Sequence, residues 1–173
     1  SNSEFLIAPS GRLNGQYNKI RLLPFNEYVP LKGKIAWPRM ITTIRKSFIP
    51  GKSYTIFKVK DARFGSPICW ENFFPDLFRR FVKDGANFMV SATNEGFYGR
   101  TAAPHQTLAM TIFRAVENRV AIARSATTGV SAFINPDGKI VEKVYKVGGL
   151  YSEAIEQIVF WLEKASGVAE NST

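Results

Sequence analysis

The segment Phe64-Gly65-Ser66-Pro67-Ile68-Cys69-Trp70-Glu71 sets the organisation of the whole chain. It is a short apolar run that ends on the only cysteine of the sequence. The run predicts a buried strand that gives way to Glu71 and then Pro75. A nucleophile at a strand-to-helix junction is held by a rigid element and stays reachable from solvent. By itself, however, a lone cysteine is more often an inert core thiol, because free cysteine is among the most buried residue types.

Downstream of the cysteine, apolar residues recur with the spacing of one helix face. They are Phe74, Leu77, Phe78, Phe81 and Val82, and the pattern ends at Gly85. Strands are expected at 87–92, 120–125, 130–135 and 140–144, with a glycine-rich loop at 93–99 and a second helix at 104–118 whose stripe is Leu108, Ile112 and Val116. This alternation predicts an α/β domain in which a mixed sheet is covered by helices.

Upstream of the cysteine, the sequence predicts strands at 4–8 and 54–59, an apolar segment at 17–23 and a helix at 37–48. Residues 24–30 are bracketed by prolines, so they form neither a regular helix nor a central strand. At the other end of the chain, Ile155, Ile158, Val159 and Leu162 predict an amphipathic terminal helix. We therefore divide the chain into a domain at 1–145 and an unassigned helix and tail at 146–173.

The composition indicates a packed globular protein. The 173 residues are 45% hydrophobic, which is enough for one domain with a substantial core. One cysteine and one histidine give no zinc-type ligand cluster, so no metal or cofactor is expected. No apolar run approaches the roughly 18 residues that a membrane-spanning helix needs. The start, Ser1-Asn2-Ser3-Glu4, lacks the layout of a signal peptide.

The net charge of +9 comes from basic residues scattered along the chain, and a solvated surface is its simplest explanation. The functional alternative is attraction to an anionic partner. We place a membrane surface above nucleic acid, because the chain has no zinc-finger spacing and no aromatic RNA-binding motif. The sequence leaves the oligomeric state open.

A cysteine nucleophile needs a group that takes its proton, and it needs donors or positive charge where the oxyanion develops. His105 is one possible base, but at a helix start a capping or packing role is the simpler interpretation. Lys19 is the better partner, since it lies just ahead of the proline-bracketed loop, although its stem could simply pack there. Two further candidates are Glu27, otherwise a surface carboxylate, and Glu71, otherwise an anchor for the next helix.

Several motifs together resemble the nitrilase superfamily. Tyr17-Asn18-Lys19, running into Leu23-Pro24-Phe25-Asn26-Glu27-Tyr28-Val29-Pro30, resembles its lysine motif, and residues 64–75 resemble its cysteine elbow. The Pro-Phe-x-Glu-Tyr-Val-Pro form is similar to one branch in particular, the apolipoprotein N-acyltransferases. Residues 93–99, 104–106, 114–118 and 124–131 resemble the same branch, so the resemblance covers residues 1–145.

This resemblance implies an αββα sandwich and a Glu-Lys-Cys triad. Cys69 would be the acyl-accepting nucleophile, Lys19 would stabilise the tetrahedral intermediate, and Glu27 would position Lys19. Trp70 and Glu71 would line the substrate site, and Asn94 would support it. The implied reaction moves an acyl group from a phospholipid to the cysteine as a thioester, and then to the N-terminal amine of a diacylglyceryl-cysteine lipoprotein. The implied location is the bacterial inner membrane, with the catalytic domain on the periplasmic side.

The chain also departs from the family pattern. The general-base glutamate of the family belongs to a strand well before the lysine motif, so the chain resembles the C-terminal two-thirds of the domain and is expected to be nearly inactive alone. Asn26 stands where the family usually has glycine, and Trp70 where tyrosine is common. Two alternatives stay open: a soluble nitrilase-type amidase that hydrolyses a small carbon–nitrogen bond, and a non-catalytic nitrilase-like module that binds a partner or a lipid.

Overall fold

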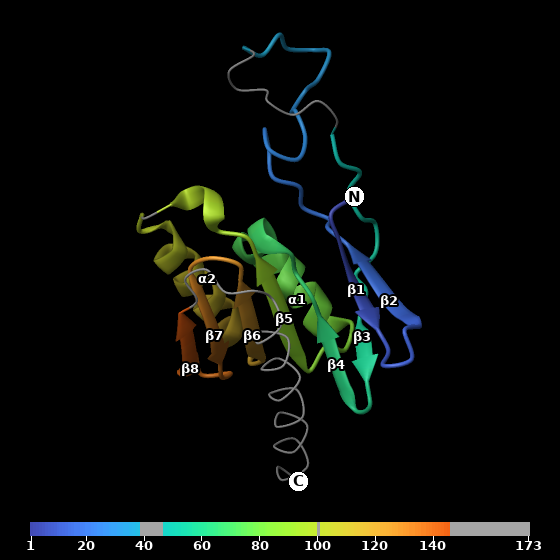
Figure 1. The fold of residues 1–173 in the computed structure, drawn as a ribbon, viewed down its shortest axis with the longest axis vertical. Coiled ribbons are helices and arrows are strands. Elements are labelled where there is room, and N and C mark those ends of the chain that lie inside the picture. The colour runs from blue at the N-terminus through green and yellow to red at the C-terminus, as the bar shows by residue number, and fades with distance from the viewer. Residues whose placement is uncertain (39–46, 100, 146–173) are drawn as a thin grey trace.

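Two sheets form the framework of the molecule (Figure 1). The computed structural model describes residues 1–38, 47–99 and 101–145. The smaller sheet pairs β1 (Ser3–Ile7) with β2 (Leu13–Asn18) in antiparallel fashion. The larger sheet has the order β3 (Phe57–Val59), β4 (Ala62–Gly65), β5 (Phe88–Thr93), β6 (Ala121–Ala126), β7 (Val130–Ile134) and β8 (Ile140–Tyr145).

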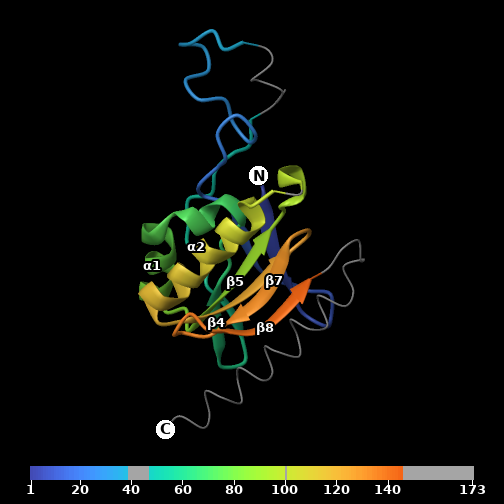
Figure 2. The same cartoon turned by 90° about the vertical axis from the view of Figure 1, so that its left-hand side faces the viewer.

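The centre of the larger sheet is parallel and its flanks are antiparallel. β4, β5 and β6 run parallel, whereas β3 pairs antiparallel with β4, and β6, β7 and β8 pair antiparallel in turn. Parallel neighbours need a crossover connection, usually a helix. The crossovers here are α1 (Pro75–Lys83) and α2 (Ala103–Asn118), and both cover the same face of the sheet (Figure 2). Two short 3-10 helices, η1 (Cys69–Phe73) and η2 (Gly96–Tyr98), precede them.

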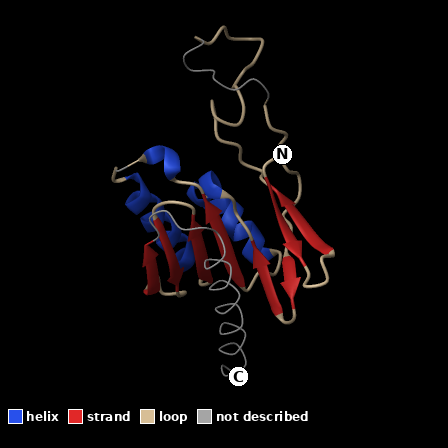
Figure 3. Cartoon of the chain, viewed as in Figure 1, coloured by secondary structure: helices blue, strands red, loops and turns tan. Residues whose placement is uncertain are grey.

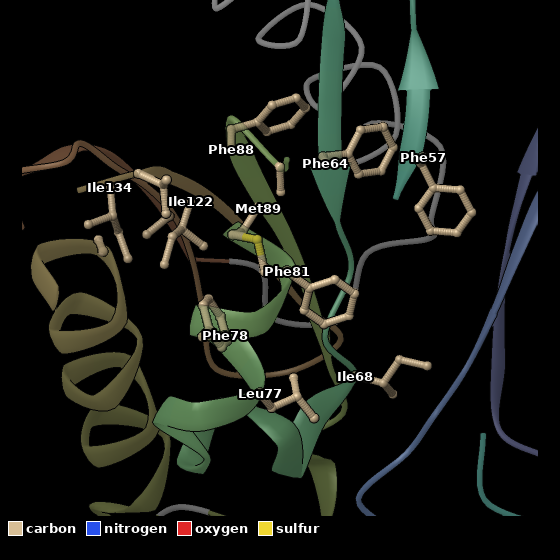
Figure 4. Packing of buried hydrophobic residues seen from close by; sticks show 14 of the residues in the cluster. Phe57, Phe64, Ile68, Leu77, Phe78, Phe81, Phe88, Met89, Ile122 and Ile134 are labelled. Atoms are coloured by element: carbon tan, nitrogen blue, oxygen red, sulfur yellow. The ribbon is translucent and has the colours of Figure 1, made fainter. Parts of the chain in front are cut away.

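The core lies between the sheet and helix α1 (Figure 4). The predicted apolar face of α1 is confirmed: Leu77, Phe78 and Phe81 are fully buried, and Phe74 and Val82 pack against the core. The helix approaches β4 closely at Gly65, where an added Cβ would lie 2.6 Å from the ring of Phe81. A side chain at this position would push the helix away from the strand that leads to the cysteine.

The stripe predicted for α2 is wrong at one end. Leu108 is buried and Ile112 packs against the core, but Val116 is 43% exposed. Steps of four residues drift by about 40° around a helix, so a stripe of this spacing rotates away from the core. The buried positions beyond Leu108 are Thr111, Arg114 and Ala115. The Thr111 hydroxyl accepts a hydrogen bond from the buried Arg124, described below.

The predicted strands and loops hold with small shifts of their ends (Figure 3). Of the apolar segment at 17–23, only Tyr17 and Asn18 lie in a strand, since β2 ends at Asn18. The strand predicted at 54–59 covers only Phe57–Val59. Residues 24–30 form no regular element, as the prolines predict, and contain one isolated bridge between Pro24 and Tyr28. Most of the helix predicted at 37–48, and all of residues 146–173, lie outside the described residues.

Candidate active site

Cys69 lies at a sharp turn at the end of the β4 segment. Ile68 still bridges to Ala92 of β5, and Cys69 then begins η1 with a backbone φ of +52°. This left-handed conformation costs a residue with a side chain about 1–3 kcal/mol. The side chain is only partly buried. The turn therefore holds the thiol at a fixed, reachable position at the carboxyl end of a parallel strand.

Lys19 and Glu27 form a buried ion pair. The Lys19 Nζ lies 2.8 Å from Oε2 and 3.0 Å from Oε1 of Glu27, and the two residues are 1% and 7% exposed. The lysine backbone is fixed on both sides, because its N–H donates to the Asn2 carbonyl and its carbonyl accepts from Gly51 N–H. The sequence placed these two residues in one site, and the structure brings them into contact.

Glu27 is held in turn by two further donors. The backbone N–H of Leu23 donates to Oε2 at 2.7 Å, and the side-chain amide of Asn2 donates to Oε1 at 2.8 Å. Burial by itself would raise the pKa of Glu27, but the hydrogen bonds from Lys19, Leu23 and Asn2 outweigh it and lower that pKa. Glu27 is therefore a carboxylate, and it pairs with the Lys19 amine in a buried position.

Glu71 connects the lysine segment to the cysteine turn. Its Oε1 accepts from the backbone N–H groups of Ile20 (2.7 Å) and Arg21 (2.9 Å), and its Oε2 accepts from Ile68 N–H (2.8 Å). The Tyr17 hydroxyl lies 2.9 and 3.0 Å from its two oxygens. Glu71 is completely buried, so none of its atoms is open to a substrate. Its contacts are those of an anchor, but for the lysine segment and the cysteine turn rather than for the next helix, which was the alternative role suggested by the sequence.

Burial affects the protonation of Glu71 as well. Burial raises the pKa of this carboxyl, while the hydrogen bonds from Arg21, Ile68, Tyr17 and Ile20 oppose the rise. Every one of these neighbours is a donor, so the ionised form satisfies them all.

Trp70 and Asn94 lie at the periphery of the site. The Trp70 ring packs within its own turn, with ring centroids 4.9 Å from Phe73 and 5.9 Å from Phe74. The Asn94 side chain is exposed and accepts the N–H of Gly96 at 3.1 Å, which shapes the start of η2. Both remain candidates for substrate contact, since both are reachable from outside.

A second buried ion pair, which the sequence did not predict, holds the loop around η2. Glu95 and Arg124 are bonded and have fully buried side chains. Arg124 also donates to the Val130 carbonyl and to the hydroxyls of Thr107 and Thr111. Two sequence signals could have indicated this pair. Glu95 is the acidic residue of the glycine-rich loop at 93–99, and Arg124 is the charged residue of a mostly apolar strand.

Tyr98 is the further candidate that the sequence did not single out. Burial raises the pKa of its phenol, and the charges of Cys69 and Glu95 add to the rise. The phenol therefore lies within electrostatic reach of the thiol. His105, by contrast, is exposed in the first turn of α2, whose N-cap residue Ala102 has no side-chain cap hydrogen bond, so the capping or packing role suggested for His105 is not supported.

Within residues 1–38, 47–99 and 101–145, no cluster of three or more His, Cys, Asp and Glu side chains could hold a metal ion. None of the helices in these ranges is long and apolar enough to cross a membrane.

Comparison with known proteins shows the family of this chain. The family model described as carbon-nitrogen hydrolase matches residues 1–150. The apolipoprotein N-acyltransferase of Geobacter metallireducens is 39% identical over 139 residues, which are 80% of this chain and 27% of that protein. The chain thus spans about a quarter of the length of this curated relative. The resemblance inferred from the motifs is confirmed.

Solved structures agree on the fold. Nit3 of Saccharomyces cerevisiae, a member of branch 10 of the nitrilase superfamily, superposes with a TM-score of 0.60 at 22% identity, over 83% of this chain and 48% of that one. An amidase mutant from Nesterenkonia sp. AN1, with acrylamide added to its active-site cysteine, gives a TM-score of 0.58 at 19% identity, over 83% and 52%. The predicted α/β fold of nitrilase type is confirmed. The chain belongs to the carbon–nitrogen hydrolase family.

Proposed function

We propose that the protein transfers an acyl group from a phospholipid to the N-terminal amine of a diacylglyceryl-cysteine lipoprotein, through a thioester on Cys69. One observation carries the proposal. Lys19 and Cys69 each neighbour a backbone N–H that binds the same buried carboxylate, Glu71, which supports the proposal that the lysine and the thiol act in one site. The similarity to proteins named apolipoprotein N-acyltransferase supports the choice of substrates.

In the first step, the Cys69 thiolate attacks the carbonyl carbon of a phospholipid ester. The carbonyl oxygen becomes an oxyanion, and the ester bond then breaks to release a lysophospholipid, whose oxygen takes up the proton lost by the thiol. The general base expected from the family resemblance is a glutamate on a strand well before the lysine motif. The lysine Nζ carries three hydrogens and the Glu27 carboxylate occupies at most two of them, so one can face the oxyanion.

In the second step, the lipoprotein amine attacks the thioester. A new amide bond forms, the carbon–sulfur bond breaks, and the thiolate of Cys69 returns while the amine loses its proton to the base. The same lysine charge stabilises this second tetrahedral intermediate. The order of events is ping-pong, because the acyl group leaves its donor before the acceptor reacts.

The remaining residues divide between substrate contact and support. We assign Trp70 and Asn94 to the substrate side, since both are reachable from outside. We assign Glu71 to positioning because it is completely buried. The Glu95–Arg124 pair supports the loop that carries Tyr98.

We place the reaction at the periplasmic face of the bacterial inner membrane, in line with a phospholipid donor. The net charge of +9 favours contact with anionic headgroups. The proposed partners of the protein are therefore a membrane surface and a lipoprotein, and not nucleic acid.

A nitrilase-type amidase is the second candidate. It is favoured by the structural neighbours, among them an amidase whose active-site cysteine is modified. Such an enzyme would use Cys69 and Lys19 in the same way, but water would take the acyl group from the thioester.

Mass spectrometry of the intact gene product tests the proposal. The protein is incubated with phospholipid vesicles, and a Cys69→Ala variant is treated in parallel. We expect a mass increase of one fatty acyl group that neutral hydroxylamine removes and that the variant lacks.

The other outcomes separate the alternatives. Absence of the adduct together with turnover of small amides would replace the proposal by the amidase. Absence of both would leave a non-catalytic module. An adduct that persists in the Cys69→Ala variant would show that the assignment of the nucleophile is wrong.

A further inference from the structure

Glu4 is an acidic residue at the junction of the two sheets, and the proposed reaction makes no use of it. It lies on β1 opposite Tyr17 of β2, which is completely buried. Its Oε2 is hydrogen bonded to the hydroxyl of Ser66, which lies between β4 and Cys69. Its Oε1 is buried and has no hydrogen-bond partner among the described residues. The carboxyl thus joins the small sheet to the segment that leads into the cysteine turn.

The hydrogen count at Ser66 constrains the charge of Glu4. A serine hydroxyl has one hydrogen. The Ser66 oxygen lies 3.0 Å from the carbonyl oxygen of Val90 on β5, and a carbonyl oxygen can only accept. When Ser66 donates to Val90, the hydrogen between Ser66 and Glu4 has to come from the carboxyl. A neutral carboxylic acid supplies this hydrogen and a carboxylate cannot.

The surroundings of Glu4 also favour the neutral form. The titratable groups around it are Glu71 on η1 and Tyr17 on β2, and neither is a cation. Among the described residues, no ion pair includes Glu4. Lys19 forms its ion pair with Glu27 instead. Burial raises the pKa of Glu4 to about 7 and the charge of Glu71 adds to the rise, whereas a hydrogen donated by Ser66 to the carboxyl would oppose it.

We propose that Glu4 is a positioning residue for Cys69 that acts as a neutral acid. Its hydrogen completes a chain of hydrogen bonds from Glu4 to Ser66 and from Ser66 to Val90, and this chain ties the β1–β2 sheet to the segment ahead of the cysteine. Loss of the hydrogen puts a second negative charge beside Glu71 and breaks the tie at Ser66. The cysteine turn is therefore held firmly below neutral pH and loosened above it, whichever substrate the thiol takes.

Alkylation of Cys69 by iodoacetamide tests this inference in the whole gene product. The rate is measured between about pH 5 and about pH 9, and peptide mass spectrometry restricts the readout to this cysteine. The wild-type profile should show an inflection near pH 7, in addition to the rise that follows the thiolate fraction. Glu4→Gln keeps a neutral donor toward Ser66 at every pH, so its profile should lack the inflection. A purely structural role would change the rate by a similar factor at all pH values.

Two further variants keep the test decisive. Ser66→Ala removes the acceptor to which the neutral acid donates, a bond that favours the protonated form, so the inflection should move to lower pH even if Glu4→Gln fails to fold. Asp61→Asn is a matched control, because it removes an exposed carboxylate and should leave the wild-type profile unchanged. The inference is overturned if Glu4→Gln keeps the inflection, if Ser66→Ala leaves its position unchanged, or if the wild type shows none.

Discussion

Lys19 and Cys69 each lie one residue away from a backbone N–H that donates to the carboxylate of Glu71. The Ile20 N–H lies 2.7 Å from Oε1 and the Ile68 N–H lies 2.8 Å from Oε2. The two oxygens of one carboxylate are fixed relative to each other, so the lysine segment and the cysteine turn are fixed relative to each other as well. A single buried side chain therefore fixes the lysine segment relative to the cysteine turn.

Replacement of Glu71 by Gln should disrupt this geometry. The amide nitrogen would face donors, either the backbone N–H of Ile68 or those of Ile20 and Arg21, and it cannot accept from them. We expect a loss of about 3 kcal/mol in the free energy of unfolding, measured by urea titration, and a clear drop in thioester formation. The Asp61→Asn variant is the matched control for loss of an acid. Unchanged stability in Glu71→Gln would contradict the anchoring role.

The backbone of Cys69 predicts an unusual order of stability among inactive variants. At a φ of +52°, glycine is tolerated and alanine is strained. Cys69→Gly should therefore be about 1 kcal/mol more stable than Cys69→Ala, although both should fail to form the thioester. Urea unfolding of the two variants measures the difference. Equal stabilities, or a more stable alanine variant, would mean that the turn is not strained.

Substitutions in the Lys19–Glu27 pair should affect the stability of the fold and the rate of thioester formation differently. Lys19→Met leaves a buried carboxylate without its cation, which should cost about 3–5 kcal/mol. The double variant Lys19→Met, Glu27→Gln removes both charges and should recover most of that loss. Its rate of thioester formation should nevertheless stay at least about 100-fold below wild type, because the oxyanion lacks its positive charge. Recovery of the rate in the double variant would exclude the catalytic role of Lys19.

The lowered pKa of Glu27 fixes the direction of an acid effect. The pair stabilises the fold at pH values above the ordinary value of 4.5, and this contribution is lost as the pH falls through the lower pKa of the folded state. Thermal unfolding should show a loss of stability below pH 4.5 in the wild type. The loss should be shallower in Glu27→Gln, which has no carboxyl to protonate. Parallel curves for the two proteins would argue against the pair.

The Glu95–Arg124 pair predicts that a distant strand controls the loop beside the thiol. Arg124→Met removes the cation from a completely buried carboxylate and three further donated bonds, so it should cost about 3–5 kcal/mol and slow thioester formation. The additional change Glu95→Gln should recover part of the stability. Arg80→Met is the control, since Arg80 forms an exposed ion pair with Asp84 and its loss should leave the unfolding midpoint nearly unchanged.

Much of the local structure could be predicted from the sequence, because it follows from neighbours along the chain. The face of α1 at Leu77, Phe78 and Phe81 is a helical repeat, and its burial follows from that repeat alone. The prolines at 24 and 30 exclude regular structure between them for a local steric reason. The lysine and cysteine motifs predict that Lys19, Glu27 and Cys69 form one constellation, and the structure brings Lys19 and Glu27 into contact.

The roles of the buried polar residues depended on contacts between segments far apart in the sequence. The position of Glu71, two residues after Cys69, predicted a residue that lines the substrate site. Its carboxylate oxygens instead accept hydrogen bonds from Tyr17, Ile20 and Ile68. The α2 stripe failed at Val116 because a four-residue spacing rotates away from the core, and the buried face of the helix includes Thr107 and Thr111, which bond Arg124 of β6. The sequence by itself determined which elements form and which residue types carry the chemistry, since periodicity and motifs are local. Only the tertiary structure decided which carboxylate meets which donor, because a buried charge is stable only where folding brings its partners to it.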